Sequence, residues 1–524
     1  MEFTINFDDM NWVAIGPEFI ILSTAFVILL AGLKKELNRN NFLSMFTFAG
    51  VGSAIILTLI LWIDAPTVTN SNNPEIFSHA LINDRFSLTF NLIILGMALF
   101  PIFGSVRYPQ EDHENKAEYF TLLLMAIAGM MFLAKSGNLI TVFLSLELFS
   151  ISLYILCGFS AKHGTGKEGP NTATELSWET ASSQESAVKY MLTGAFASAV
   201  LVYGMALIYA GSGTTEIRLI GQLTEENPYT KNTLVFIGLG LMFCGLAFKV
   251  SLVPFHSWTP DVYQGAPTPI TGFMSVATKA AVFAVIARIF FTSFSDLDKV
   301  WMPILFGASV LTMLVGNTAA IFQDDLKRML AYSSIAQIGY IVLGISLANE
   351  MGFTGGILHL VNHAFMKGCL FLVAGAIIYQ TGRREIRSFR NLSSTMPWTT
   401  AAFTICAFGM IGLPPTGGFF SKVYLILGAI DGEHWVFVGV ILVSSVLAIG
   451  YLANVIRYMY LPATENELDE PVGRTIHGAS SGEKVPLTML IPLLILASGV
   501  ILLGMFNGVV ISQFIDPAIP TGLR

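Results

Sequence analysis

Six basic side chains and one carboxylate interrupt otherwise apolar stretches of this 524-residue chain. A cationic side chain near the centre of a bilayer costs about 2.5 to 3.5 kcal/mol on insertion scales, so we expect such residues to face the protein interior or water. Histidine titrates near neutrality and a buried lysine can do so too, so the set could pass protons where water fills the gaps. The residues are Glu147, Lys249, Lys279, His359, His363, Lys367 and Lys422.

The spacing of these residues indicates how helices would present them. His359, His363 and Lys367 recur every four residues, which places them on one helical stripe about 12 Å long. Prolines at 254, 260, 267 and 269 follow Lys249 and remove backbone donors that a spanning helix needs. His256 would share a face with Lys249 if the helix continued that far. Glu147 is the only carboxylate that we place well inside a span, so we expect it to be the counter-ion of Lys249.

Structural interpretations stand beside these functional ones. A single polar residue in a span can be a satisfied interhelical contact, and for Lys279 or His256 alone the two interpretations carry equal weight. The complete set favours function, because intramembrane ionisable groups usually mark transport pathways. His359 and His363 have metal-ligand spacing, but no carboxylate or cysteine accompanies them on that helix, so we expect no metal site. The four cysteines occur singly, which argues against iron–sulfur ligation or a disulfide framework.

The elements that must position these residues are membrane spans. With 54% hydrophobic and 12% charged residues, the chain reads as an all-α polytopic membrane protein. We expect solvated loops at 161–184 and 462–485. Apolar runs predict fourteen spans, near 12–33, 41–63, 83–104, 118–136, 138–160, 185–210, 232–256, 267–291, 300–322, 330–348, 352–379, 397–430, 434–461 and 486–511.

A weak internal symmetry relates two of these spans. The seventh carries Lys249 before its prolines, and the twelfth carries Pro414 and Pro415 before Lys422. An offset of five spans reverses orientation, so spans four to eight and nine to thirteen would form inverted five-helix repeats with broken helices seven and twelve. The predicted units are a three-helix segment at 1–117, repeats at 118–296 and 297–461, and an acidic loop with a last helix at 462–524.

Orientation follows from the positive charges. If the N-terminus lies outside, 17 of the 28 lysines and arginines fall on the cytoplasmic side, 7 on the other, and the remaining four within spans. Both termini are therefore expected on the non-cytoplasmic side, with a bacterial inner membrane as the expected location. No lysine or arginine precedes the first apolar run, so we expect that run to be an anchor.

The central motifs carry a family resemblance. FKVSLVPFHSWTPDVYQGAPTP, VATKAAVF and NTAAIFQDDLKRMLAYSSIAQIGY resemble the N-type antiporter-like subunit of respiratory complex I, also called subunit 2 of NADH:quinone oxidoreductase, over roughly residues 118 to 460. The resemblance implies a fourteen-helix fold with inverted repeats and a proton channel. By resemblance, Glu147, Lys249, Lys279 and Lys422 are the glutamate of the fifth span and the lysines of the seventh, eighth and twelfth. It also implies neighbouring antiporter-like subunits as partners. NADH, FMN, iron–sulfur clusters and quinone are expected in partner subunits and no cofactor in this chain.

One segment indicates an alternative assembly. HLVNHAFMKGCLFLVAGA is more similar to the M- and L-type subunits and to the D-type subunit of multisubunit cation/proton antiporters. The alternative function is therefore a subunit of a multisubunit sodium/proton antiporter or a related membrane complex. An integral redox enzyme is disfavoured, because haem and iron–sulfur ligand patterns and a GxGxxG loop are all missing from the sequence. With a net charge of −7 and no basic patch, nucleic acid is not an expected partner.

Overall fold

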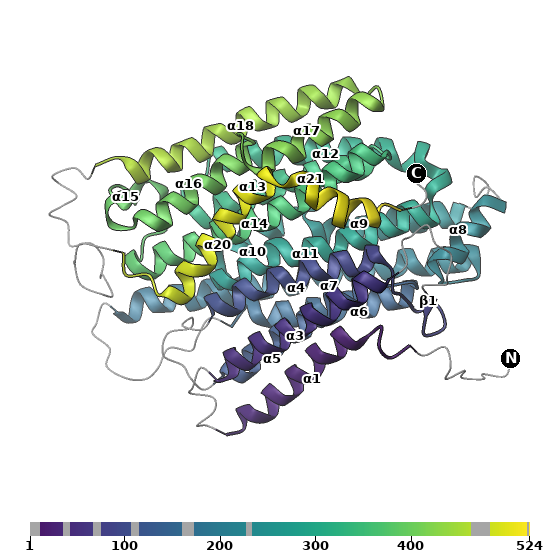
Figure 1. Ribbon diagram of the computed structural model, residues 1–524, viewed down its shortest axis with the longest axis horizontal. Coiled ribbons are helices and arrows are strands. Elements are labelled where there is room, and N and C mark those ends of the chain that lie inside the picture. The colour runs from purple at the N-terminus through teal and green to yellow at the C-terminus, as the bar shows by residue number, and fades with distance from the viewer. Residues whose placement is uncertain are drawn as a thin grey trace.

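The computed structural model describes residues 11–34, 42–65, 75–105, 115–159, 172–226, 233–462, 483–520 and 523. Nearly all of them are helical, and the long helices run along the long axis of the molecule (Figure 1). Twelve described helices are long and apolar enough to cross a membrane, and α1 and α16 are shorter apolar helices. The predicted all-α polytopic membrane fold is confirmed, whereas the count of fourteen spans stays a prediction.

The N-terminal segment consists of three helices and a short hairpin. Its purple and dark blue helices lie along the lower part of Figure 1. The Asp84 side chain accepts a hydrogen bond from the Ser87 backbone N–H at 2.8 Å and so caps the third long helix. The elements are α1 (Gly16–Gly32), α3 (Phe42–Asp64), the antiparallel pair β1 (Glu75–Ile76) and β2 (Leu81–Ile82), and α4 (Arg85–Gly104).

The first predicted repeat begins with α5. Its elements are α5 (Lys116–Ala134), α6 (Leu139–Cys157), α7 (Thr172–Ser212), α8 (Ile217–Glu226), α9 (Thr233–Val250), α10 (Trp258–Gly265), α11 (Thr268–Arg288) and the π-helix η3 (Ile289–Ser293). The expected solvated loop at 161–184 was wrong from residue 172 onward, where α7 has already begun. That stretch contains no glycine or proline, so it lacks the residues that most strongly oppose a helix. Residues 160–171 and 463–482 lie outside the described residues.

The second predicted repeat and the C-terminal segment complete the chain. The repeat contains η4 (Ser295–Leu297), α12 (Asp298–Ile321), α13 (Leu326–Ser346), α14 (Glu350–Thr381), η5 (Ile386–Ser388), α15 (Leu392–Thr395), α16 (Pro397–Ile411), α17 (Gly417–Asp431) and α18 (Trp435–Tyr460). The C-terminal elements are α20 (Leu487–Met505), α21 (Asn507–Val510), η6 (Ile511–Ile515) and η7 (Asp516–Ala518).

Burial divides the helices into a central and a peripheral group. The apolar window of α11 is completely buried, and those of α13 and α14 are nearly so, whereas α3 and α18 expose most of theirs. A helix that is apolar all round and buried inside a bundle can carry a polar side chain only where other helices satisfy it. Both predicted interruptions are present, between α9 and α10 and between α16 and α17. The equivalence of the two halves as inverted repeats stays a prediction.

Candidate functional site

Lys249 lies in the last turn of α9, where the helix is interrupted. The helix ends at the next residue, and the Lys249 side chain is only 3% exposed. Its ammonium donates to the Ser150 hydroxyl at 2.9 Å and to the Tyr154 hydroxyl at 3.2 Å, both on α6. His256 lies beyond the end of α9, so the condition under which it would share a helical face with Lys249 is not met.

Glu147 is close to this lysine without pairing with it. The half-buried carboxylate accepts a hydrogen bond from the Ser198 hydroxyl of α7 at 2.5 Å. We expected Glu147 to be the counter-ion of Lys249. In the described part of the chain no ion pair within 4.0 Å joins the two residues, so the expected direct contact is absent. Lys249 reaches α6 about one and two turns beyond Glu147, at Ser150 and Tyr154. Hydroxyl groups therefore separate the two charges.

Lys279 on α11 completes the hydrogen bonding of the interruption. It is 1% exposed and donates to the Lys249 carbonyl at 2.9 Å and to the Ser251 hydroxyl at 2.7 Å. The Val253 N–H, which a continued helix would direct at that carbonyl, donates instead to the Thr312 hydroxyl at 3.0 Å. A buried break in a helix needs such partners, because unpaired backbone groups are costly inside a membrane protein.

The predicted stripe of His359, His363 and Lys367 is present on α14, the long central helix. The two ring nitrogens of His359 contact the Ser421 hydroxyl and the Gln337 side-chain oxygen, both at 2.9 Å. His363 is fully buried, and neither of its ring nitrogens has a hydrogen-bond partner in the described structure. The stripe thus passes from a histidine held by two helices to one without a protein partner.

Lys367 continues this stripe toward α13. Its ammonium donates to the Leu330 carbonyl at 3.0 Å and also contacts the Ser333 hydroxyl. The side chain is fully buried. Like Lys249 and Lys279, it is held by neutral oxygen atoms.

Lys422 contacts the second helix interruption, which lies between α16 and α17. Its ammonium donates to the carbonyls of Met410 and Ile411 at 3.0 and 2.9 Å, and to the Ser445 hydroxyl at 3.0 Å. The carbonyls belong to the C-terminal end of α16, where the helix dipole favours a cation. Gly412 ends α16 with a φ of 90°, and a Cβ there would lie 3.0 Å from the Lys422 side chain. Glycine at this position therefore provides both the turn and the space for the lysine.

Comparison with known proteins identifies the family. A family profile described as "NADH:quinone oxidoreductase/Mrp antiporter, TM" matches residues 174–448. The chain belongs to this family. NADH-quinone oxidoreductase subunit N of Trichlorobacter lovleyi is 34% identical over 492 residues, which is 92% of this chain and 95% of that protein. F(420)H(2) dehydrogenase subunit N of Methanosarcina mazei is 32% identical over 508 residues, which is 94% of this chain and 95% of that protein.

Solved structures agree with this membership. A chain of respiratory complex I from Thermus thermophilus with bound aureothin is 26% identical, with a TM-score of 0.72, and the match covers 95% of this chain and 98% of that one. A chain of the Mrp complex from Dietzia sp. DQ12-45-1b is 22% identical, with a TM-score of 0.80 and coverage of 98% and 99%. The second likeness shows the fold alone. The resemblance inferred from the central motifs is confirmed.

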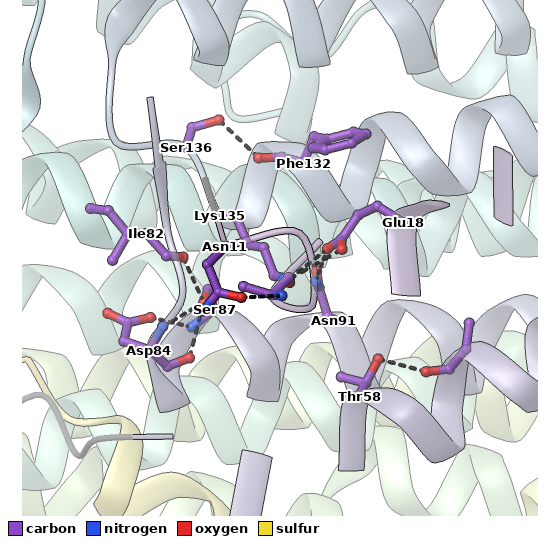
Figure 2. Close-up of polar contacts among 12 residues, drawn as sticks. Asn11, Glu18, Thr58, Ile82, Asp84, Ser87, Asn91, Phe132, Lys135 and Ser136 are labelled. Carbon is purple, nitrogen blue, oxygen red and sulfur yellow. Dashed lines mark hydrogen bonds and ion pairs between the residues drawn. The ribbon is translucent and has the colours of Figure 1, made fainter. Parts of the chain in front are cut away.

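A buried ion pair in this family member was missed from the sequence. Glu18 of α1 and Lys135, which follows α5, are both fully buried and pair at 2.9 Å (Figure 2). Lys135 also donates to the Ala14 carbonyl at 2.6 Å, and Asn91 of α4 donates to Glu18 at 2.9 Å. Glu18 lies in the first turn of α1, so an apolar helix other than that of Glu147 also carries a buried carboxylate. Glu18 lay within the first predicted span and was the signal that could have revealed the pair.

One cluster of candidate metal ligands occurs among the described residues, away from the lysines. Glu75, His79 and Glu216 place ligand atoms within 4.8 Å of one another. Arg218 already pairs with Glu75 at 2.8 Å, and His79 also hydrogen-bonds to Glu75. The carboxylate at the centre of this cluster thus has partners within the protein.

Proposed function

We propose that this chain is a proton-translocating, antiporter-like subunit of a complex I-type quinone oxidoreductase. Quinone reduction in partner subunits would drive proton movement through this chain, and NADH, FMN, iron–sulfur clusters and quinone would bind in those partners. The observation that carries the proposal is a shared feature of four buried lysines: within the described part of the chain, each donates only to neutral oxygen atoms. They are Lys249, Lys279, Lys367 and Lys422.

Neutral partners suit lysines that must gain and lose protons. A buried carboxylate partner would hold a lysine in its charged form, whereas burial among hydroxyls and carbonyls brings the charged and neutral forms closer in free energy. A small electrostatic change nearby can then load or release a proton. Glu147 supports this assignment, because it lies near Lys249 without contacting it and its approach or withdrawal would bias the lysine. We propose the pair as the switch of the first half of the chain.

Buried polar atoms without protein partners indicate where the proton route would contain water. Such atoms are usually satisfied by ordered water in folded proteins. On α14, both ring nitrogens of His363 and the side-chain oxygen of Asn362 are of this kind. The hydroxyls of Tyr263 and Tyr340 and the amide nitrogen of Gln337 are others. We propose that water connects His363 to His359 and Lys367 at these positions.

The face of α6 beside Glu147 is the proposed contact for a neighbouring antiporter-like subunit. Leu144 and Ile151, one turn before and after Glu147, have exposed fractions of 61% and 53%. Lipid could cover these apolar side chains, but a half-buried carboxylate between them needs a polar or charged partner. A neighbouring membrane subunit that supplies a cationic or hydroxyl group would satisfy it. Glu147 would then sense a charge change in that neighbour.

Ion pairs divide the loops into the two sets that the proposed topology requires. Asp261 on α10 pairs with Lys189 on α7 at 3.1 Å and with Arg328 on α13 at 2.7 Å, so three predicted cytoplasmic ends meet. Glu75 and Arg218 meet on the opposite set of loops, and Figure 1 places β1 and α8 together at the right end, away from α15. We propose that the lysine- and arginine-rich end faces the cytoplasm of a bacterial inner membrane and that the termini lie outside.

The test measures proton uptake and quinone reduction in vesicles that contain the assembled complex. Lys249→Ala and Glu147→Gln should each lower the number of protons moved per electron, while quinone reduction in uncoupled membranes continues. Lys299→Ala and Glu350→Gln are matched controls, because both side chains are exposed. Parent proton yield in both Lys249→Ala and Glu147→Gln, at equal assembly, would refute the proposed roles. Sodium uptake in place of proton uptake would favour the antiporter alternative.

A further inference from the structure

The two ring nitrogens of His359 on α14 face different helices and different chemical groups. Nδ1 contacts the Ser421 hydroxyl of α17, and Nε2 contacts the side-chain oxygen of Gln337 on α13, both at 2.9 Å. All three side chains are fully buried. A hydroxyl can exchange its hydrogen, whereas an amide does not readily do so, and the two nitrogens therefore differ in what can happen at each.

The contact with Gln337 determines the state of Nε2. An amide oxygen can only accept a hydrogen bond, so Nε2 must carry a hydrogen and donate it. The amide nitrogen of Gln337 has no hydrogen-bond partner in the described structure, so the amide does not continue a chain of protein donors. Nε2 thus keeps its hydrogen whether the ring is neutral or charged.

The contact with Ser421 suits Nδ1 with or without a hydrogen. The Ser421 hydroxyl also lies 3.0 Å from the Gly418 carbonyl, to which it can donate. When the ring is charged, Nδ1 donates to the serine oxygen and the hydroxyl hydrogen points to Gly418. When the ring is neutral, the hydroxyl turns and donates to Nδ1. Both nitrogens therefore have a hydrogen-bond partner in either state.

A buried oxygen without a protein partner lies at the same interface between α14 and α17. Asn362 follows His359 by three residues, so the two side chains are neighbours on one face of α14. Its amide nitrogen donates at 2.8 Å to the carbonyl of Gly417, one helical turn before Ser421. Its side-chain oxygen is one of the buried atoms at which we proposed water above. Water at this oxygen would lie within about one turn of Ser421.

We infer that Gln337 is a positioning residue for proton exchange at His359, because it holds the Nε2 hydrogen and leaves Nδ1 as the nitrogen that exchanges. This inference rests on the proton route proposed above. A protonated water molecule gives a proton to the Ser421 oxygen while Ser421 passes its own hydrogen to Nδ1. The ring gains one proton, the water loses one and the serine is unchanged. Release follows the reverse order.

Carboxylates do not supply the charge that would hold a proton on this ring. The His359 ring lies 5.0 Å from the Tyr340 ring, whose centre is 4.8 Å from the Lys422 ammonium. Among the described residues, the buried ionisable groups of α14 and of the helices packed against it include no carboxylate, so the oxygen atoms of Gln337 and Ser421 stabilise the charged ring. The other groups are Lys279 and Arg288 on α11, Lys327 and Tyr340 on α13, His363, Lys367 and Cys369 on α14, Cys406 on α16, and Lys422 on α17.

The experiment is the pH profile of proton pumping by the assembled complex in vesicles, with quinone reduction measured in parallel. Gln337→Met removes the acceptor at Nε2, so His359 should lose its proton at lower pH and the alkaline limb should move toward acid by about half a pH unit. Gln337→Glu places a carboxylate at Nε2 and should move the same limb toward alkali. Gln513→Met is the matched control, because Gln513 is exposed, and its profile should stay in place.

Opposite shifts distinguish positioning of the proton from a general loss of structure. Shifts of both Gln337 variants in one direction, or parent profiles in both, would overturn this inference. Exchange at Nδ1 also predicts that Ser421→Ala pumps less than Ser421→Thr, which keeps a hydroxyl. Equal pumping by these two variants, at equal assembly, would refute exchange through Ser421. Parent pumping by His359→Ala would instead overturn the place of His359 in the proposed route.

Discussion

Replacing Lys279 by methionine should destabilise the interruption between α9 and α10 as well as stop proton transfer. Methionine has a similar length but no donor, so the Lys249 carbonyl loses its 2.9 Å partner inside the protein. Leaving a buried acceptor unpaired costs about 1 to 3 kcal/mol. Ser251 loses its 2.7 Å contact with Lys279 but keeps the Thr259 hydroxyl as a partner at 2.6 Å, so it adds little. We expect a loss of about 1 to 3 kcal/mol.

Lys249→Met is the comparison that makes this prediction specific. Lys249 donates to two hydroxyls, and Ser150 keeps a hydrogen bond of 2.6 Å to the Leu146 carbonyl when the ammonium is gone. Hydroxyl groups can also rotate toward other partners, whereas a fixed backbone carbonyl cannot. The expected loss of stability is therefore below about 1 kcal/mol. Both variants should lose pumping, but only Lys279→Met should lose stability.

The assay is thermal denaturation of the purified complex in detergent, with pumping measured on the same preparations in vesicles. The midpoint should fall for Lys279→Met and stay close to that of the parent for Lys249→Met. An equal fall in the two variants would mean that the contact with the Lys249 carbonyl does not stabilise the interruption. An unchanged midpoint for Lys279→Met would refute the reasoning as well.

Two buried ion pairs provide further predictions. Lys135→Met leaves the Glu18 carboxylate buried without its partner and should cost about 3 to 5 kcal/mol, while the double variant with Glu18→Gln should recover much of that loss in the same thermal assay. Asp84→Asn keeps a capping side chain but breaks the bidentate contact with Arg288 at 3.0 and 2.9 Å. Its denaturation midpoint should therefore fall further than that of Asp325→Asn, because Asp325 caps α13 and the structure shows no ion pair at that cap. Burial raises the pKa of Asp84, but the charge and hydrogen bonds of Arg288 outweigh burial and lower that pKa below its ordinary value. The stability from this pair should therefore be complete above about pH 4 and be lost as the pH falls through the lowered pKa. A difference in denaturation midpoint between the parent and Asp84→Asn that persisted in stronger acid would contradict this.

The sequence predicted features that depend on spacing within one helix. The four-residue recurrence of His359, His363 and Lys367 placed them on one stripe, because helical geometry fixes that relation before any packing is known. The prolines after residue 253 predicted the first interruption for a similar reason. Residues 172–184 were assigned to a loop because they are polar and rich in serine and threonine, although they contain no glycine or proline that would end a helix.

Contacts between helices could not be predicted in the same way. Lys249 was expected to pair with Glu147, yet the register of α9 against α6 places it at hydroxyl groups farther along that helix. Serine, threonine and tyrosine are common in apolar spans and often bond to their own helix, so the sequence does not distinguish the hydroxyl that receives a buried lysine. The partnership of Glu18 with Lys135 was missed because neither residue was counted among the ionisable residues inside the predicted spans.

The comparison of relatives bears on how proton movement is coupled to electron transfer. Subunits named for an NADH-quinone oxidoreductase and for an F(420)H(2) dehydrogenase match this chain over nearly its full length at similar identity, 34% and 32%. These two relatives are named for different electron donors, so the sequence that each shares with this chain has no reason to recognise the donor itself. The driving signal should therefore reach the lysines through contacts with neighbouring membrane subunits. In our proposal Glu147 receives this signal, because its carboxylate is half-buried at an exposed apolar face and lies on the same helix as the two hydroxyl groups that hold Lys249.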